Sequence, residues 1–137
     1  MKITVETEVL APPKKVWDAW VTPDHITKWN YAIDEWCCPL AELDLRVGGK
    51  FKYRMEAKDG SVGFDFEGVF IKVAPQQSLH FELGDKRIVT TEFTQTTNGT
   101  RVAETFDAED ENSAEQQRQG WQSILNNFKK YVEDQNG

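Results

Sequence analysis

The sequence predicts an α+β fold in which a long C-terminal helix packs on a curved antiparallel sheet. Three observations support this prediction. Apolar residues recur at helical spacing from Trp121 to Val132. From Glu35 to Phe106, short runs of alternating apolar and polar residues are separated by tight-turn signals. Two short helical segments follow a strand near the N-terminus, so helices and strands are largely segregated along the chain.

The N-terminal elements can be assigned in order. Residues 2–10 alternate between apolar or threonine side chains and mostly charged ones, which is typical of a half-buried strand. Pro13 suits the first turn of a helix, and the apolar spacing continues that helix to Val21. Thr22 then serves as the N-cap of a second short helix that ends near Trp29.

The middle of the chain predicts about six strands, which with the first strand make a sheet of six or seven. Lys50–Met55 alternates cleanly between charged and apolar residues. Asp59-Gly60 and Asn98-Gly99 are typical hairpin turns. Because strands joined by tight turns pair antiparallel, the sheet is expected to be antiparallel throughout.

The C-terminal helix is predicted from Ala114 to Glu133. Ser113 and Gln116 fit a capping box at its start. Gly120 lies inside this helix, and we expect a close contact with the sheet to offset its cost of roughly 1 kcal/mol relative to alanine. With no repeat or linker in the sequence, residues 1–137 are expected to form a single domain.

Charge and composition exclude several classes of function. The chain has 23 acidic and 16 basic residues and a net charge of −7, which disfavours nucleic acid and anionic lipid as partners. No run approaches the roughly 20 apolar residues of a membrane span, so membrane insertion is not expected. The first residues lack the apolar run of a signal peptide, so we expect a cytoplasmic protein.

Metals and cofactors are not expected. The two histidines are too few for the usual zinc ligand set. Cys37 and Cys38 are adjacent, and in a strand their side chains point to opposite faces. We interpret them as two small hydrophobic residues, with a redox or metal-binding pair as the alternative.

The chain is rich in rings, with five Trp and eight Phe, and these fill either a solid core or the wall of a cavity. Glu104 is in phase with inward-facing neighbours on the last strand, where a carboxyl would lose solvent and have a raised pKa unless it is paired. The candidate ligand-binding residues are Trp20, Trp29, Phe51, Tyr53, Phe64, Phe66, Phe81, Phe93, Glu104, Trp121, Leu125 and Phe128.

Each polar candidate also has a purely structural interpretation. Glu104 could face a wet sheet edge or pair with Arg87 or Arg101. Tyr53 could be held by backbone rather than face a ligand, and His25 could be an exposed residue of a first helical turn. Glu92 is in phase with Ile88 and Thr90, and the same two interpretations apply to it. No nucleophile motif or phosphate-binding loop is present, so no catalytic residue is assigned.

Several motifs together resemble the START-like, helix-grip superfamily also called SRPBCC. The nearest branch is similar to the C-terminal domain of the activator of heat-shock protein 90 ATPase. In sequence order, the motifs are Ala11–Trp20 with Thr22-Pro23-Asp24-His25 and Lys28-Trp29 behind it, Asp44-Leu45-Arg46-Val47-Gly48-Gly49-Lys50-Phe51, Phe66-Glu67-Gly68, Val73-Ala74-Pro75 with Leu79, and Gly120-Trp121. The family's second helix usually carries a tryptophan pair, but here Asn30 follows Trp29.

The resemblance implies a sheet wrapped around the long helix, often with an apolar cavity between them, and no common catalytic motif. Three functions therefore stay open. The first is non-enzymatic binding of an apolar small molecule. The second is a co-chaperone-like module that binds a heat-shock protein 90 type ATPase, with Trp36 as a possible anchor. The third is a small cyclase or hydrolase that uses Glu104, Tyr53 or His25 as acid–base groups.

Overall fold

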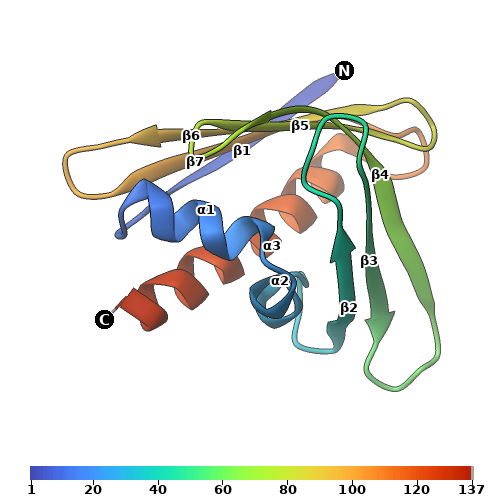
Figure 1. Ribbon diagram of the computed structural model, residues 1–137. Coiled ribbons are helices and arrows are strands. Elements are labelled where there is room, and N and C mark those ends of the chain that lie inside the picture. Colours follow the sequence, from blue (N-terminus) through green and yellow to red (C-terminus); the bar gives the residue numbers. More distant parts are fainter. Residues whose placement is uncertain (137) are drawn as a thin grey trace.

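A computed structural model describes residues 1–136 of the chain and consists of one sheet and three helices (Figure 1). The elements in chain order are β1 (Lys2–Val9), α1 (Pro13–Val21), α2 (Pro23–Trp29), β2 (Trp36–Leu43), β3 (Lys50–Ala57), β4 (Gly63–Ala74), β5 (Ser78–Leu83), β6 (Ile88–Gln95), β7 (Thr100–Asp107) and α3 (Ala114–Asn136).

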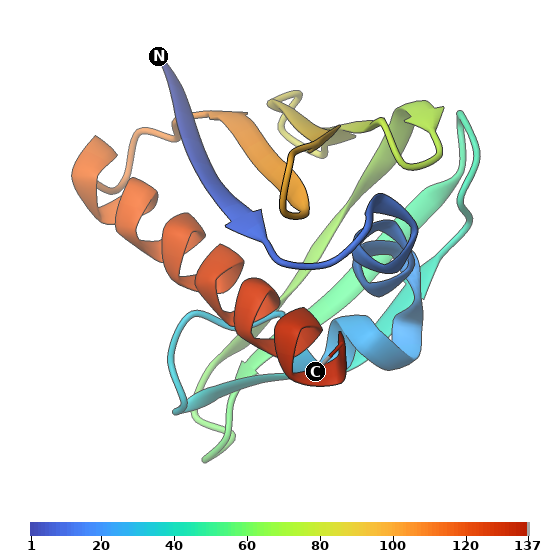
Figure 2. The same cartoon turned by 90° about the vertical axis from the view of Figure 1, so that its left-hand side faces the viewer.

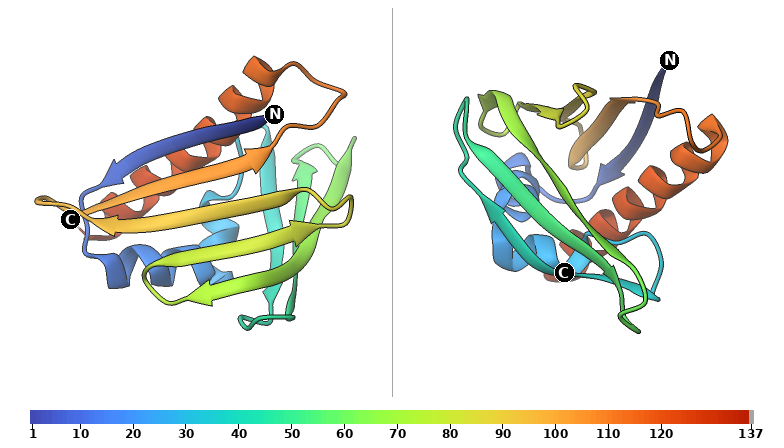
Figure 3. Two further views of the ribbon diagram at one scale, coloured as in Figure 1. Left: turned by 90° about the horizontal axis from the view of Figure 1, so that it is seen from above. Right: turned by 90° about the vertical axis from the view of Figure 1, so that its right-hand side faces the viewer.

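The seven strands form one antiparallel sheet in the order β1-β7-β6-β5-β4-β3-β2. Figure 3 shows β1, β7, β6 and β5 side by side from above, while β2, β3 and β4 turn away to form a second arm. The bend lies in β4, where the register with β5 shifts between Phe70 and Lys72. The sheet is therefore strongly curved, with one concave face.

Two glycine positions permit this curvature. Gly68 lies in the middle of β4, and a Cβ atom there would lie 2.4 Å from the Glu82 carbonyl oxygen. Gly48, in the turn between β2 and β3, has a φ of 85° that favours glycine. Gly68 thus allows β5 to approach β4 closely, and Gly48 allows the turn that leads into β3.

The helix α3 crosses the concave face. Figure 2 shows it running past β1, at one edge of the sheet. Its start has the predicted capping box, in which the Gln116 backbone N–H donates to Ser113 Oγ at 3.1 Å. Leu125, Phe128 and Val132 are buried on its inner face. The amphipathic stripe thus packs the helix onto the sheet.

The two short helices lie beside α3 on the same concave side of the sheet (Figure 1). Trp20 from α1 and Trp29 from α2 lie with ring centroids 5.0 Å apart, and both meet Phe128 of α3 at 4.8 Å. Phe93 of β6 contacts Trp20 from the sheet at 5.9 Å. This aromatic cluster joins all three helices to the sheet.

The predicted fold class is confirmed: α+β, with seven antiparallel strands, a long C-terminal helix and two short helices after the first strand. Two details differ. The helix α3 continues beyond Glu133 to Asn136. The close contact expected at Gly120 is absent, since a Cβ atom there would meet nothing within 4 Å. Within residues 1–136, no helix is both long enough and apolar enough to span a membrane.

Candidate functional site

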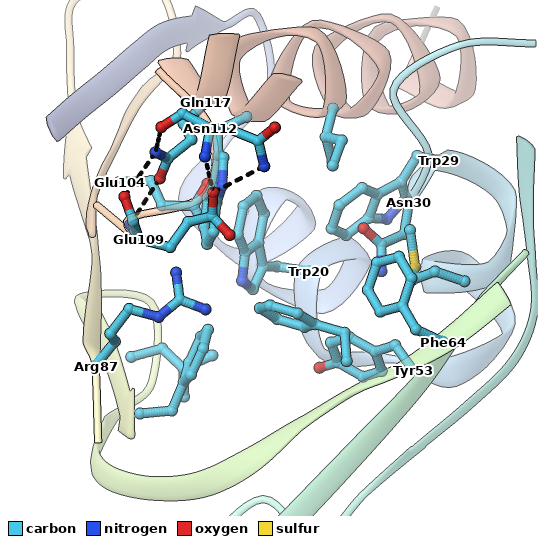
Figure 4. A pocket seen from close by; sticks show the side chains of 16 residues that line it. Trp20, Trp29, Asn30, Tyr53, Phe64, Arg87, Glu104, Glu109, Asn112 and Gln117 are labelled. Carbon is cyan, nitrogen blue, oxygen red and sulfur yellow. Dashed lines mark hydrogen bonds between the residues drawn. The ribbon is translucent and has the colours of Figure 1, made fainter. Parts of the chain in front are cut away.

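A cavity of about 330 Å³ lies between the concave face of the sheet and the helices. Figure 4 shows its lining, with Trp20 near the middle. It is lined by Trp20, Trp29, Asn30, Tyr53, Met55, Phe64, Phe66, Leu79, Phe81, Arg87, Glu104, Glu109, Asn112, Gln117, Trp121 and Ile124. Phe64 and Asn112 are exposed, so the cavity reaches solvent where they line it.

The alternation of strand residues explains much of this lining. Tyr53 of β3 pairs with Phe66 of β4, and Met55 pairs with Phe64, so these four side chains share the inner face of the second arm. On β5, Phe81 also faces inward. Successive inward positions on three strands thus give a continuous apolar wall.

The helix α3 supplies the opposite wall. Trp121 stacks on Phe106 of β7, with ring centroids 4.0 Å apart and an interplanar angle of 12°. Its ring also approaches Phe66 edge-on at 6.1 Å. Ile124 lies one helical turn further on. Contacts with rings of two strands therefore fix the position of Trp121 in this wall.

The structure brings together eight of the twelve candidate residues as cavity lining and places four elsewhere. Trp20, Trp29, Tyr53, Phe64, Phe66, Phe81, Glu104 and Trp121 line the cavity. Phe51, Phe93, Leu125 and Phe128 are buried in the solid core and do not line it. Sequence periodicity places these four on the inner face correctly, but it cannot tell a packed ring from one that borders a void.

Glu104 is a buried acid in the cavity wall, with only 7% of its surface exposed. In the described part of the chain no side chain forms an ion pair or hydrogen bond with its carboxyl group. Arg87 instead pairs with Asp85 at 2.7 Å, and Arg101 pairs with Glu6. Burial therefore raises the pKa of Glu104 from 4.5 to about 8. Neither ion pair considered from the sequence forms.

Thr91 lies directly opposite Glu104 in the register between β6 and β7. Its side chain is fully buried, and within residues 1–136 its Oγ1 is the buried side-chain atom that has no hydrogen-bond partner. Leu79 precedes Thr91 and Val5 follows Glu104 along the same cross-strand row. A buried hydroxyl without a partner thus lies beside a carboxyl that borders the cavity, in an otherwise apolar row.

The loop between β7 and α3 closes the polar end of the cavity. Buried Gln117 accepts a hydrogen bond from the Glu109 backbone N–H at 2.9 Å. Its amide nitrogen donates to the carbonyl oxygens of Glu109 at 3.1 Å and Asn112 at 2.8 Å. The Glu109 carboxyl accepts two bonds from Asn112, both at 2.7 Å. One side chain of α3 thereby positions a loop that lines the cavity, as Figure 4 shows.

The sequence reasoning missed eight lining residues: Asn30, Met55, Leu79, Arg87, Glu109, Asn112, Gln117 and Ile124. Three of them were detectable. Met55 and Leu79 alternate in phase with assigned inward positions, and Ile124 belongs to the helical stripe. The polar residues carry no such signal, because a turn or loop residue has no periodic neighbours that fix its direction.

The other polar candidates do not form one acid–base site. Tyr53 lines the cavity, and burial, with smaller effects from Cys38 and Glu104, raises the pKa of its phenol. His25 lies in a separate depression and is hydrogen-bonded to Tyr131. Glu92 is exposed and binds His80 at 2.7 Å. Glu104, Tyr53 and His25 therefore do not converge.

The cysteines are free thiols at the start of β2. Cys38 is buried, and burial raises the pKa of its thiol to about 11, so the thiol is protonated at neutral pH. Cys37 is half-buried. In the described residues, no three His, Cys, Asp or Glu side chains gather where they could hold a metal ion.

The chain is similar to several bacterial proteins of known structure. It is 46% identical to the AHSA1-like protein from Aeromonas hydrophila, with a TM-score of 0.93, covering 99% of this chain and 94% of that one. A protein from Cytophaga hutchinsonii is 47% identical, with a TM-score of 0.84 and coverage of 98% and 94%. Protein CV1439 from Chromobacterium violaceum, at 24% identity and a TM-score of 0.88 over 97% and 98%, shares the fold.

No curated protein matches the sequence. The family model described as activator of Hsp90 ATPase homolog 1-like protein matches residues 10–133. This match and the solved structures confirm the resemblance to the START-like, helix-grip superfamily. The chain belongs to the family of activator of Hsp90 ATPase homolog 1-like proteins.

Proposed function

We propose that this protein binds an apolar small molecule in the cavity between the sheet and α3, without catalysing a reaction. Its family and fold support a ligand-binding or co-chaperone-like module, and the cavity favours the first. The observation that carries the proposal is a void of about 330 Å³ with aromatic rings on both its sheet wall and its helix wall, which lies at the lower end of the size range of small-molecule sites.

The aromatic wall would contribute most of the affinity. Trp20, Trp29 and Trp121 present ring faces or edges to the cavity from three different helices. Apolar area removed from water contributes roughly 25 cal/mol per Å². Since the rings pack against one another and against the sheet, the ligand would enter a largely formed site.

The proposal is tested by titrating the neutral fluorophore N-phenyl-1-naphthylamine while following tryptophan quenching. We expect saturable binding of one molecule per chain. Ile124→Phe adds bulk to the cavity wall and should weaken binding at least ~10-fold, about 1.4 kcal/mol. Ile71→Phe, the same change on β4 at a residue that is 45% exposed and outside the cavity lining, should leave binding unchanged. Absence of saturable uptake by the wild type would refute the proposal.

A co-chaperone-like role is the second candidate. It is supported by the family description and by an apolar patch at the free end of the second arm. Trp36 is half-buried and meets the exposed ring of Phe64 at 6.0 Å. Ile33 and Val62 are exposed nearby, and their carbonyl oxygens accept hydrogen bonds from the backbone N–H groups of Trp36 and Ala57. Such a patch fits the anchor of a protein interface.

This second role is tested separately by adding the protein to an Hsp90-type ATPase and measuring its turnover rate. Phe64→Ser should reduce any stimulation, while Ile71→Ser, an exposed apolar residue of β4 outside the patch, should not. An unchanged ATPase rate with the wild-type protein would exclude this role.

A further inference from the structure

The polar groups of the cavity wall indicate which head group an apolar ligand would carry. Glu104 is more than nine-tenths buried, lines the cavity and has no partner among the described side chains. The Thr91 hydroxyl beside it also lacks a partner. Buried polar groups are normally satisfied, so a buried carboxyl that lines a cavity and has no partner marks a place where a ligand supplies the missing bond.

Resting on the proposed function, we infer that the ligand class is an amine with an apolar body, whose ammonium group binds the Glu104 carboxylate and displaces its proton to solvent. The step balances as a neutral Glu104 carboxylic acid plus an ammonium ligand giving the ion pair and one released proton. Thr91, opposite Glu104 in the strand register, is fully buried behind the cavity lining, so the carboxylate is the group that meets the ammonium.

The charges around the site favour a cation over an anion. Glu109 contributes a second carboxyl to the same lining. The Arg87 guanidinium also lines the cavity, but its Nε donates to Asp85 at 2.7 Å and its Nη1 to the Asp107 carbonyl oxygen at 3.5 Å. A ligand carboxylate would therefore meet the carboxyls of Glu104 and Glu109 and an Arg87 guanidinium that already binds Asp85. The net charge of −7 adds long-range attraction for cations.

The remaining groups that face Glu104 do not compete for the ammonium. Tyr53, on β3, has a pKa raised by burial and stays neutral. From α3, the facing side chains are Gln117 and Trp121, which carry no charge. Gln117 is also fully used in holding the loop before α3. Glu104 is thus the acceptor left for a buried cation.

Proton release gives this inference a signature that needs no variant. With a pKa of about 8 in the free protein, Glu104 is mostly protonated at pH 7, so amine binding should release about 0.9 proton per molecule there. The affinity should rise about 10-fold per unit of pH below pH 7 and level off above about pH 8. Tyr53, whose pKa is raised by burial, stays neutral over this range.

The experiment uses three probes with one body: naphthylethylamine, naphthylethanol and naphthylacetate. Calorimetry in buffers of different ionisation enthalpy, from pH 6 to pH 9, gives affinity and proton release together. We expect the amine to bind at least ~10-fold more tightly than the alcohol at pH 9, and the carboxylate to bind most weakly. Glu104→Gln should remove the amine preference and the proton release but keep alcohol binding. Glu82→Gln, an exposed acid on β5 with the same change in charge, should keep all three.

The outcomes separate this inference from the proposed function. Equal binding of alcohol and amine at pH 9, amine binding without proton release at pH 7, or tightest binding of the carboxylate would overturn the amine assignment and leave apolar ligand binding intact. If none of the three probes binds and the fluorophore is also not taken up, both fail. Loss of the pH dependence in Glu82→Gln as well as in Glu104→Gln would also contradict the role of Glu104.

Discussion

At position 104, β7 places a carboxyl group on the inner face of the sheet, opposite Thr91 and beside the cavity. The unfolded chain exposes this group to water, where its pKa is near 4.5, whereas the folded protein holds it with a pKa of about 8. Between these values the folded state retains a proton that the unfolded state releases. The free energy of unfolding therefore falls as pH rises through this range, by up to about 1.4 kcal/mol per unit.

Glu104→Gln should abolish that decline because glutamine keeps the shape and has no charge to bury. We expect variant and wild type to have similar stability at pH 5 and the variant to be more stable by roughly 2–4 kcal/mol at pH 8. Urea unfolding at both pH values measures this. Carboxyls with lowered pKa values, such as Asp107 and Glu115, are common to both proteins and cancel in the difference. A constant difference across the range would contradict the buried, unpaired state of Glu104.

Two buried threonines allow a matched comparison. Thr91 Oγ1 has no partner, while Thr100 Oγ1 donates to the Ala11 carbonyl oxygen at 2.8 Å. Both side chains are fully buried. We expect Thr91→Val to raise the free energy of unfolding by about 1 kcal/mol and Thr100→Val to lower it by about 1–2 kcal/mol. Denaturant unfolding of the pair tests this. Equal destabilisation by both would mean that Thr91 has a partner, such as a bound water.

At the scale of elements, most of the secondary structure could be predicted because each signal is local. The alternation at Lys50–Met55 and the turn at Asn98-Gly99 depend only on nearby residues. The helix α3 ends three residues later than predicted, because the residues beyond Glu133 are polar and continue the helix without adding to its buried stripe. The bend within β4 is different, because it lies where the register with β5 shifts, which is a relation between two strands.

Two glycines in different elements should respond in opposite ways to alanine. Gly68→Ala places a methyl group 2.4 Å from a backbone oxygen of β5, which cannot move without breaking the strand pairing. Gly120→Ala adds a methyl group in open space within a helix. We expect a loss of at least ~2 kcal/mol for the first and a gain of about 1 kcal/mol for the second. Thermal unfolding distinguishes them. Destabilisation by Gly120→Ala would instead indicate that Gly120 makes the close contact with the sheet that the sequence predicts.

On the scale of the whole molecule, the cavity is where both arms of the sheet meet all three helices. A ligand there contacts Trp20 of α1, Phe66 of β4 and Trp121 of α3 at once. Binding should therefore stabilise the folded protein as a unit, by about 2.7 kcal/mol at a ligand concentration 100 times Kd. A rise in Tm with ligand concentration, with slower amide exchange in both arms and in α3, checks this. Protection confined to α3 would mean a peripheral site.

The sequence by itself determined the strands, the helices, their antiparallel pairing and most of the apolar residues that face inward. These follow from patterns that repeat over two to four residues, so they can be recognised in the sequence. The tertiary structure alone decided which inward residues border a void. Phe51 and Phe81 share the same inward pattern, yet Phe51 is packed in the core and Phe81 lines the cavity. The isolation of Glu104 was likewise decided in space, because its candidate partners Arg87 and Arg101 bind other acids. Whether a buried group finds a partner depends on the positions of residues far away in sequence. A local sequence pattern does not contain those positions.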